Sequence, residues 1–162
     1  MIFLLILIGI AVYYDIRYFR IPNELIGIGM LTGIVYRVMN QTAVCSDILL
    51  GMLIPVVVLF LLFYLHMLGA GDIKLLSMAG IFLGTSVFTV IWESFVIAAV
   101  ISLVQLIIQK KFRNRILYFI GYCLNTMRTG KPEPYYQAEQ DQYKHAMHFS
   151  VGILGGVILH YL

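Results

Sequence analysis

Two long apolar runs, Ile48 to Leu68 and Val87 to Ile108, constrain the fold of this chain more than any other feature. Each is long enough to cross a bilayer, because a helix needs ~20 apolar residues to span about 30 Å of hydrocarbon. A segment in lipid must satisfy its backbone polar groups within the protein, so it forms a helix or part of a closed barrel. These runs lack the alternation of a barrel strand, and we therefore expect helices.

The composition extends this expectation to the whole chain. Of its 162 residues, 61% are hydrophobic and only 12% are charged, whereas soluble domains carry roughly 25% charged residues. We predict an all-α polytopic membrane protein with six transmembrane helices, forming a single membrane-embedded domain over residues 1–162. The expected apolar segments are Ile2 to about Tyr14, Leu25 to Met39, Ile48 to Leu68, Ile73 to about Phe88, Val87 to Ile108, and Met147 to Leu162.

Proline, glycine and polar residues mark the expected connections. Asn23, which follows Pro22, is expected to cap the second helix, and Asp47 to cap the third. Gly69 and Gly71 are expected to end the third helix and to let the backbone turn tightly. Residues 84–86 (Gly-Thr-Ser) are expected to separate the fourth and fifth helices.

Basic residues cluster on one side of this arrangement. Of the eleven Lys and Arg residues, ten fall in three connections on one face, and only Arg37 falls on the other. The positive-inside rule makes the basic face cytoplasmic. We therefore expect a multi-pass protein of the plasma membrane with both termini outside and a polar, basic cytoplasmic loop over residues 109–144. Within it, residues 116–127 either lie along the headgroup interface or form a loop.

Two aspartates, Asp15 and Asp72, meet the cytoplasmic boundary in this topology. An unpaired charge at such a position is costly, so an acid there suggests a function. Aspartyl proteolysis needs two carboxyl groups around one water: the ionised one takes a proton from the water, and the protonated one stabilises the oxyanion. Two close carboxylates share a proton and titrate as a pair. The alternative is that each aspartate only caps a helix or pairs with a cation.

The motifs around these aspartates resemble those of the type IV prepilin peptidases. Residues 15–23 (Asp-Ile-Arg-Tyr-Phe-Arg-Ile-Pro-Asn) are similar to the first aspartate motif of that family, and residues 69–74 (Gly-Ala-Gly-Asp-Ile-Lys) to the second, Gly-x-Gly-Asp-x-Lys. The similarity covers about residues 9–108. Archaeal preflagellin peptidases share the pattern, and presenilin-type proteases share its Gly-x-Gly-Asp core.

This resemblance implies a membrane aspartyl endopeptidase that removes a short, basic, cytoplasmic leader from prepilin-like precursors, cutting just before their hydrophobic helix. It implies that Asp15 and Asp72 are the catalytic pair. The residues that it marks as shaping the site are Gly69, Gly71, Lys74, Pro22 and Asn23. Methylation of the new amino terminus is not expected, because the cysteine-bearing domain that accompanies it in many bacterial relatives is not seen here.

Two other functional classes remain open. A proton- or ion-coupled transporter also uses acids within membrane helices, but no inverted repeat is visible. A non-catalytic pilus-assembly subunit is the third possibility, although both motifs are intact. The expected partners are a single-helix precursor and the lipid bilayer, with no nucleic acid; the sequence does not specify an oligomeric state.

Several further residues carry weaker expectations. His145 and His148 have a spacing that could hold a metal, but no third ligand is evident, and we expect no metal and no cofactor. Glu93 lies inside a predicted span, where it either binds a polar partner or serves a site. Lys74 either contacts the substrate or sets orientation at the membrane surface. Other expected roles are topological for Arg17 and Arg20, interfacial for His66, and structural for the unpaired Cys45 and Cys123.

Overall fold

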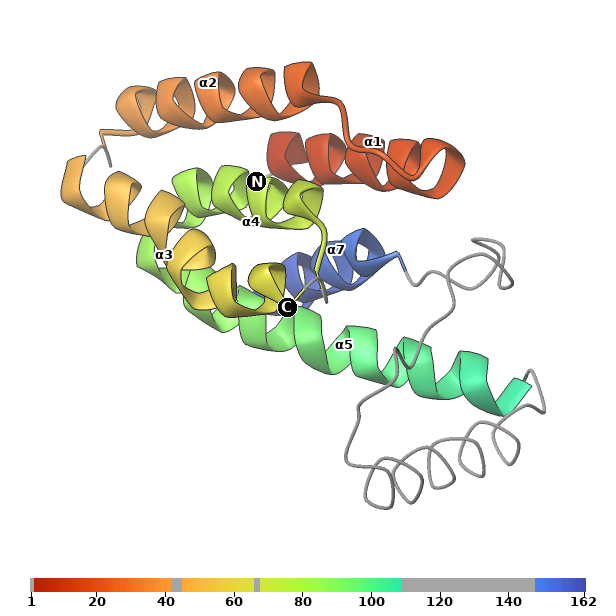
Figure 1. Cartoon of the computed structure of the whole chain (residues 1–162). Helices are drawn as coiled ribbons and strands as arrows, with labels where there is room; N and C mark the ends of the chain where they lie inside the picture. Colours follow the sequence, from red (N-terminus) through yellow and green to blue (C-terminus); the bar gives the residue numbers. More distant parts are fainter. Residues whose placement is uncertain (1, 42–44, 66–67, 109–147) are drawn as a thin grey trace. The chain divides into compact units, whose positions relative to one another are not determined.

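The computed structural model describes residues 2–41, 45–65, 68–108 and 148–162. Its contacts divide the chain into two units, residues 1–99 with 148–162, and residues 100–147. Loop 109–144, His66, Cys123 and His145 lie outside the described residues. The elements are α1 (Ile2–Tyr18), α2 (Asn23–Met39), α3 (Cys45–Tyr64), α4 (Ala70–Leu83), the 3-10 helix η1 (Gly84–Ser86), α5 (Val87–Ile108) and α7 (Phe149–His160) (Figure 1).

The all-α prediction is confirmed for these residues, which contain no strand. Two of their stretches, Cys45–Tyr64 and Ala70–Gln105, are long and apolar enough to cross a membrane, and Phe149–His160 is apolar but shorter. The predicted topology of six spans therefore stays a prediction. The break at Gly84–Ser86 and the bounds of α5 are those that the sequence predicted.

Other boundaries differ from the expected ones in ways that matter for the two aspartates. Helix α1 continues past the first apolar segment to Tyr18, so Asp15 lies inside its last turn, an extension that the flanking residues Ile16 and Tyr18 allow. Helix α4 begins at Ala70 rather than Ile73, which puts Asp72 in its first turn. Backbone amides in a first helical turn lack partners within the helix, and the helix dipole there favours negative charge.

Three capping predictions are wrong. Pro22 is the N-cap of α2, and Asn23 is its first helical residue and makes no capping bond. Gly69 is the N-cap of α4, with φ −75°, and Gly71 lies within α4, so neither glycine ends α3. Asp47 lies in the first turn of α3, and its carboxylate pairs with Arg37 of α2 and accepts a hydrogen bond from the backbone N–H of Thr85 at 3.0 Å.

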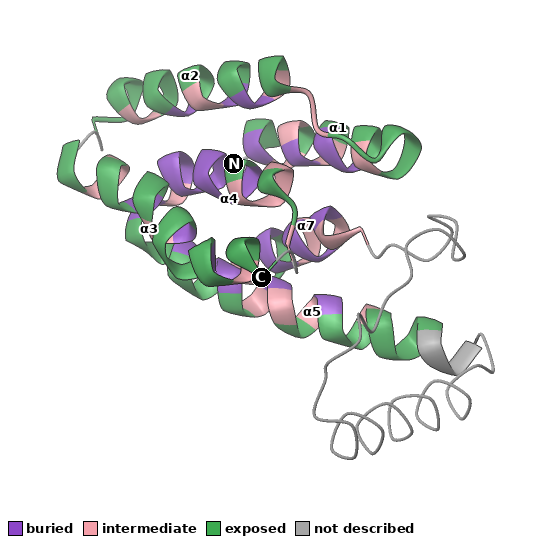
Figure 2. Cartoon of the chain, viewed as in Figure 1, coloured by how far each residue is buried: buried purple, intermediate pink, exposed green. Residues whose placement is uncertain are grey.

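Helix α4 forms the centre of the first unit. Eight consecutive residues, 75 to 82, are buried, so the helix is covered on every side (Figure 2). It contacts α1, α2, α3 and α7. Its crossing with α3 is the closest, because a Cβ built on Gly80 would lie 1.9 Å from the carbonyl oxygen of Gly51. Two backbones can meet at this distance only where both residues are glycine, as small residues allow between helices in membranes.

The outward faces of the helices are apolar. On α3, Val57 is 71% exposed and Leu61 is 63% exposed, and Figure 2 shows exposed residues along the outer sides of α1, α2 and α3. A soluble monomer rarely exposes apolar surface in such continuous stripes. The surface is therefore compatible with a lipid environment.

Candidate active site

Asp15 is held at the end of α1 by contacts with the last helix. The Ser150 hydroxyl donates a hydrogen bond to Oδ2 of Asp15 at 2.5 Å, and Nδ1 of His148 lies 3.2 Å from the same oxygen. The Asp15 side chain is 17% exposed. The helix ends just beyond it, where Phe19 adopts a left-handed conformation (φ +53°) and donates its backbone N–H to the Asp15 carbonyl at 2.9 Å.

Asp72 lies in the first turn of α4 and is half-buried. Its backbone N–H donates to the carbonyl of Gly69 at 3.2 Å. The Gly69 backbone also packs against the side chain, because a Cβ at that position would come within 3.3 Å of Oδ2 of Asp72. The backbone at Gly69 therefore lies close to the Asp72 carboxylate at the start of α4, and a small residue suits this position.

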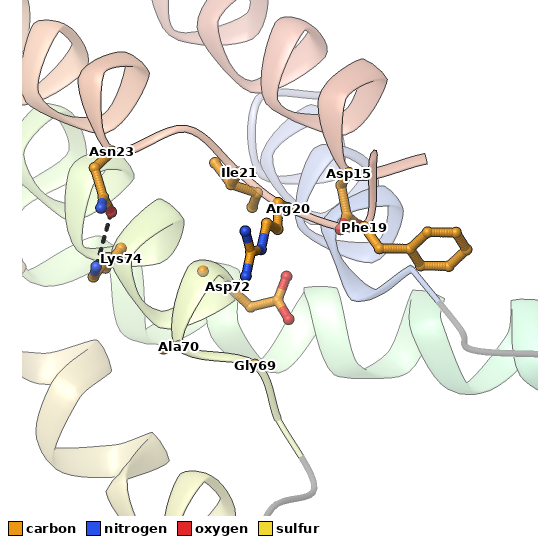
Figure 3. A pocket seen from close by; sticks show the side chains of 10 residues that line it. Asp15, Phe19, Arg20, Ile21, Asn23, Gly69, Ala70, Asp72 and Lys74 are labelled. Carbon is orange, nitrogen blue, oxygen red and sulfur yellow. Dashed lines mark hydrogen bonds between the residues drawn. The ribbon is translucent and has the colours of Figure 1, made fainter. Parts of the chain in front are cut away.

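The two aspartates line one pocket of about 270 Å³, Asp15 from α1 and Asp72 from α4. A pocket of this size has room for water molecules. The residues lining it are Asp15, Phe19, Arg20, Ile21, Asn23, Gly69, Ala70, Gly71, Asp72 and Lys74 (Figure 3).

The pocket brings together six of the seven site residues named from the sequence. Lys74 donates a hydrogen bond to the side-chain oxygen of Asn23 at 2.9 Å, which joins α4 to the start of α2 at the pocket rim. A Cβ on Gly71 would meet Ile21 at 3.5 Å, an ordinary contact. Pro22 does not line this pocket but a neighbouring one.

The neighbouring pocket has a volume of about 510 Å³ and shares Arg20, Ile21 and Asn23 with the first. Its remaining lining includes Tyr14 and Tyr18 of α1, whose rings lie 5.7 Å apart. Both tyrosines are exposed. The two pockets therefore adjoin at Arg20, Ile21 and Asn23.

Some residues that line the pocket or contact Asp15 were missed or misinterpreted in the sequence. Arg20 was expected to have a topological role, yet its side chain lines the same pocket as the two aspartates (Figure 3). Its place within the first aspartate motif was a usable signal. Ser150 had no local signal, because its partner Asp15 is 135 positions away. His148 was considered only as a metal ligand.

The described residues contain no group of three His, Cys, Asp or Glu side chains that could hold a metal ion. Glu93 of α5 does not line the aspartate pocket. Its Oε2 is buried and has no hydrogen-bond partner within the part of the chain that the structure describes, and His160 of α7 lies 3.8 Å away. Cys45 is exposed and unpaired.

Residues 2–104 match the family model of the type IV leader peptidases. No curated protein matches the chain significantly, and no solved structure does. The matched region contains both aspartates and every residue that lines their pocket. It ends before α7, whose Ser150 and His148 contact Asp15.

Proposed function

The chain belongs to the type IV leader peptidase family, and on that premise we propose that it is a membrane aspartyl endopeptidase acting on prepilin-like precursors. Asp15 and Asp72 are the catalytic pair. The observation that carries the proposal is the shared pocket: carboxylates 57 positions apart in the sequence come to the same cavity from α1 and α4.

The reaction needs a single water between the two carboxyl groups. One carboxylate takes a proton from the water as its oxygen attacks the peptide carbonyl. The other carboxyl group donates a hydrogen bond to the oxyanion that develops. A proton shared by two neighbouring carboxyls supplies both forms at once. Half-burial of Asp72 and the low exposure of Asp15 limit competing water around the reacting atoms.

The substrate in this proposal is a precursor with one hydrophobic helix, whose basic leader remains in the cytoplasm. The surface formed by Tyr14, Tyr18 and Arg20 supports an approach from the outer side of α1. The substrate segment that contains the scissile peptide bond, just before the hydrophobic helix, then unwinds and reaches the aspartates in an extended conformation. Arg20 lines both pockets and lies on the path of the unwound segment.

The proposal includes a multi-pass topology in the plasma membrane, with the aspartates at the cytoplasmic boundary. The apolar stretches and exposed apolar faces support it. Single cysteines at Glu24 and Gln41, which lie at opposite ends of α2, test it in a variant lacking Cys45 and Cys123. An impermeant maleimide should label position 41 in intact cells and position 24 only after permeabilisation; the reverse pattern would contradict the orientation.

Cleavage of a prepilin precursor by membranes containing the protein tests the activity. Asp15→Asn and Asp72→Asn should each lower the rate at least about 100-fold, because each removes a proton-transfer group. Glu24→Gln is the matched control: it neutralises an acid in the first turn of α2 that lines neither pocket. Retained cleavage in either aspartate variant would refute the proposal, and a transporter would cleave in none of them.

A further inference from the structure

The N-terminal end of α7 contacts Asp15 in a way that neither the motifs nor the family match includes. Helix α7 packs against α1. Its first turn presents Ser150 and the preceding residue His148 to the Asp15 carboxylate. The dipole of α7 also favours a negative charge beside this helix end. Two side chains and one helix end therefore act on the same carboxylate.

Ser150 is fully buried, and its hydroxyl crosses to another helix. Ser94 provides a comparison, because it is equally buried but donates at 2.6 Å to the carbonyl of Val90 in its own helix. Such a local bond is the usual role of a serine inside a helix. The bond of Ser150 is different, since it ends on an ionisable side chain at the candidate site.

Both contacts from α7 end on the same oxygen of Asp15. Ser150 and His148 both contact Oδ2, and no described residue donates a hydrogen bond to Oδ1. The His148 ring packs against the ring of Phe19, which follows the end of α1, and the two ring centroids lie 4.9 Å apart. One carboxylate oxygen is thus fixed by the protein, and the other is left for a water.

We infer that Ser150 and His148 are positioning residues that hold the Asp15 carboxylate through Oδ2, so that Oδ1 takes the proton from the attacking water. This inference rests on the proposed function, and it assigns the base to Asp15 and the oxyanion donor to Asp72. Helix α7 is then a required part of the site. The donors act on orientation and charge and do not touch the substrate.

Steady-state cleavage of a prepilin precursor tests the inference with two matched pairs. Ser150→Ala should lower kcat about 10- to 100-fold, as expected for a hydrogen bond to a charged group, with KM unchanged within about twofold. Ser150→Thr keeps a hydroxyl, whereas Ser150→Val has the shape of threonine without the hydroxyl. The kcat of the Thr variant should therefore exceed that of the Val variant by a similar factor. His148→Asn should retain more activity than His148→Leu, because the amide N–H can replace Nδ1–H.

Ser77→Ala is the control for removing a buried hydroxyl. Ser77 is 2% exposed, and its Oγ has no hydrogen-bond partner among the described residues. The kcat of the Ser77→Ala variant should equal that of wild type. An unchanged kcat for Ser150→Ala, an effect on KM alone, or equal activity of the Thr and Val variants would overturn the inference. Each result leaves the proposed function intact as long as Asp15→Asn is inactive; cleavage by Asp15→Asn would instead refute both.

Discussion

The ammonium of Lys74 and the side-chain oxygen of Asn23 are 2.9 Å apart and connect the N-terminal part of α4 to the first residue of α2 across the rim of the aspartate pocket. Both residues belong to the motifs that flank the aspartates in the sequence. Among the described contacts, neither residue forms a hydrogen bond with an aspartate, so their geometry favours a role in holding the rim. Figure 3 shows this bond beside Asp72.

Removing either partner of this bond should lower cleavage by a similar and modest factor. A single hydrogen bond contributes roughly 0.5–1.5 kcal/mol, so Lys74→Met and Asn23→Ala should each reduce kcat/KM about two- to tenfold. The double variant should lose little more than the worse single variant, because both remove the same interaction. Asn40→Ala is the control, since the Asn40 side chain donates to the carbonyl of Tyr36 at the other end of α2. Additive losses would show that the two side chains act separately.

The crossing of α3 and α4 should tolerate no added atom. Gly80→Ala places a Cβ 1.9 Å from the backbone oxygen of Gly51, and a backbone atom cannot rotate away. We expect destabilisation of at least about 3 kcal/mol, at the upper end for overpacked sites. Gly27→Ala, where nothing lies within 4 Å, should be neutral or stabilising. Thermal unfolding in detergent measures both, and an unchanged midpoint for Gly80→Ala would contradict this packing.

The helices were readable from the sequence because their hydrogen bonds are local and their apolar runs are long. Helix α5 begins and ends where its run does. The ends of α1 and α4 were harder to predict, since Asp15 and Asp72 are polar yet continue a helical turn. A hydropathy pattern ends at the first charge, whereas the helix α1 ends only where Phe19 turns left-handed.

The contacts that organise the site could not be read from local patterns. Asn23 fits an N-cap by residue type, but its side-chain oxygen accepts from Lys74, 51 positions away. The role of Ser150 depends on how α7 packs against α1, which no spacing in the sequence encodes. The aspartates themselves could be identified, because a charge at the end of an apolar segment stands out and the flanking motifs are specific.

The two glycines before Asp72 should give different kinetic effects. Gly69→Ala brings a Cβ within 3.3 Å of Oδ2 of Asp72, so the carboxylate must shift by a few tenths of an ångström. We expect a lower kcat, since small displacements of a catalytic group cost up to about 100-fold. Gly71→Ala meets Ile21 at an ordinary 3.5 Å and narrows the pocket, so KM should rise more than kcat falls. The same change in both parameters for the two variants would contradict this distinction.

The polar cluster of Asp47, Arg37 and Thr85 should matter for stability and not for catalysis. It lies at the end of α4 opposite to Asp72, where Gly84 has φ +63° and a Cβ would clash with the Asp47 carboxylate. Asp47→Ala removes the acceptor of Thr85 N–H and leaves the Arg37 guanidinium, whose side chain is 12% exposed, without this partner. We expect a loss of about 1–3 kcal/mol in the free energy of unfolding, measured by denaturation in detergent. The kcat of the folded fraction should equal that of wild type, and a fall in kcat beyond the folded fraction would show that this cluster is coupled to the aspartates.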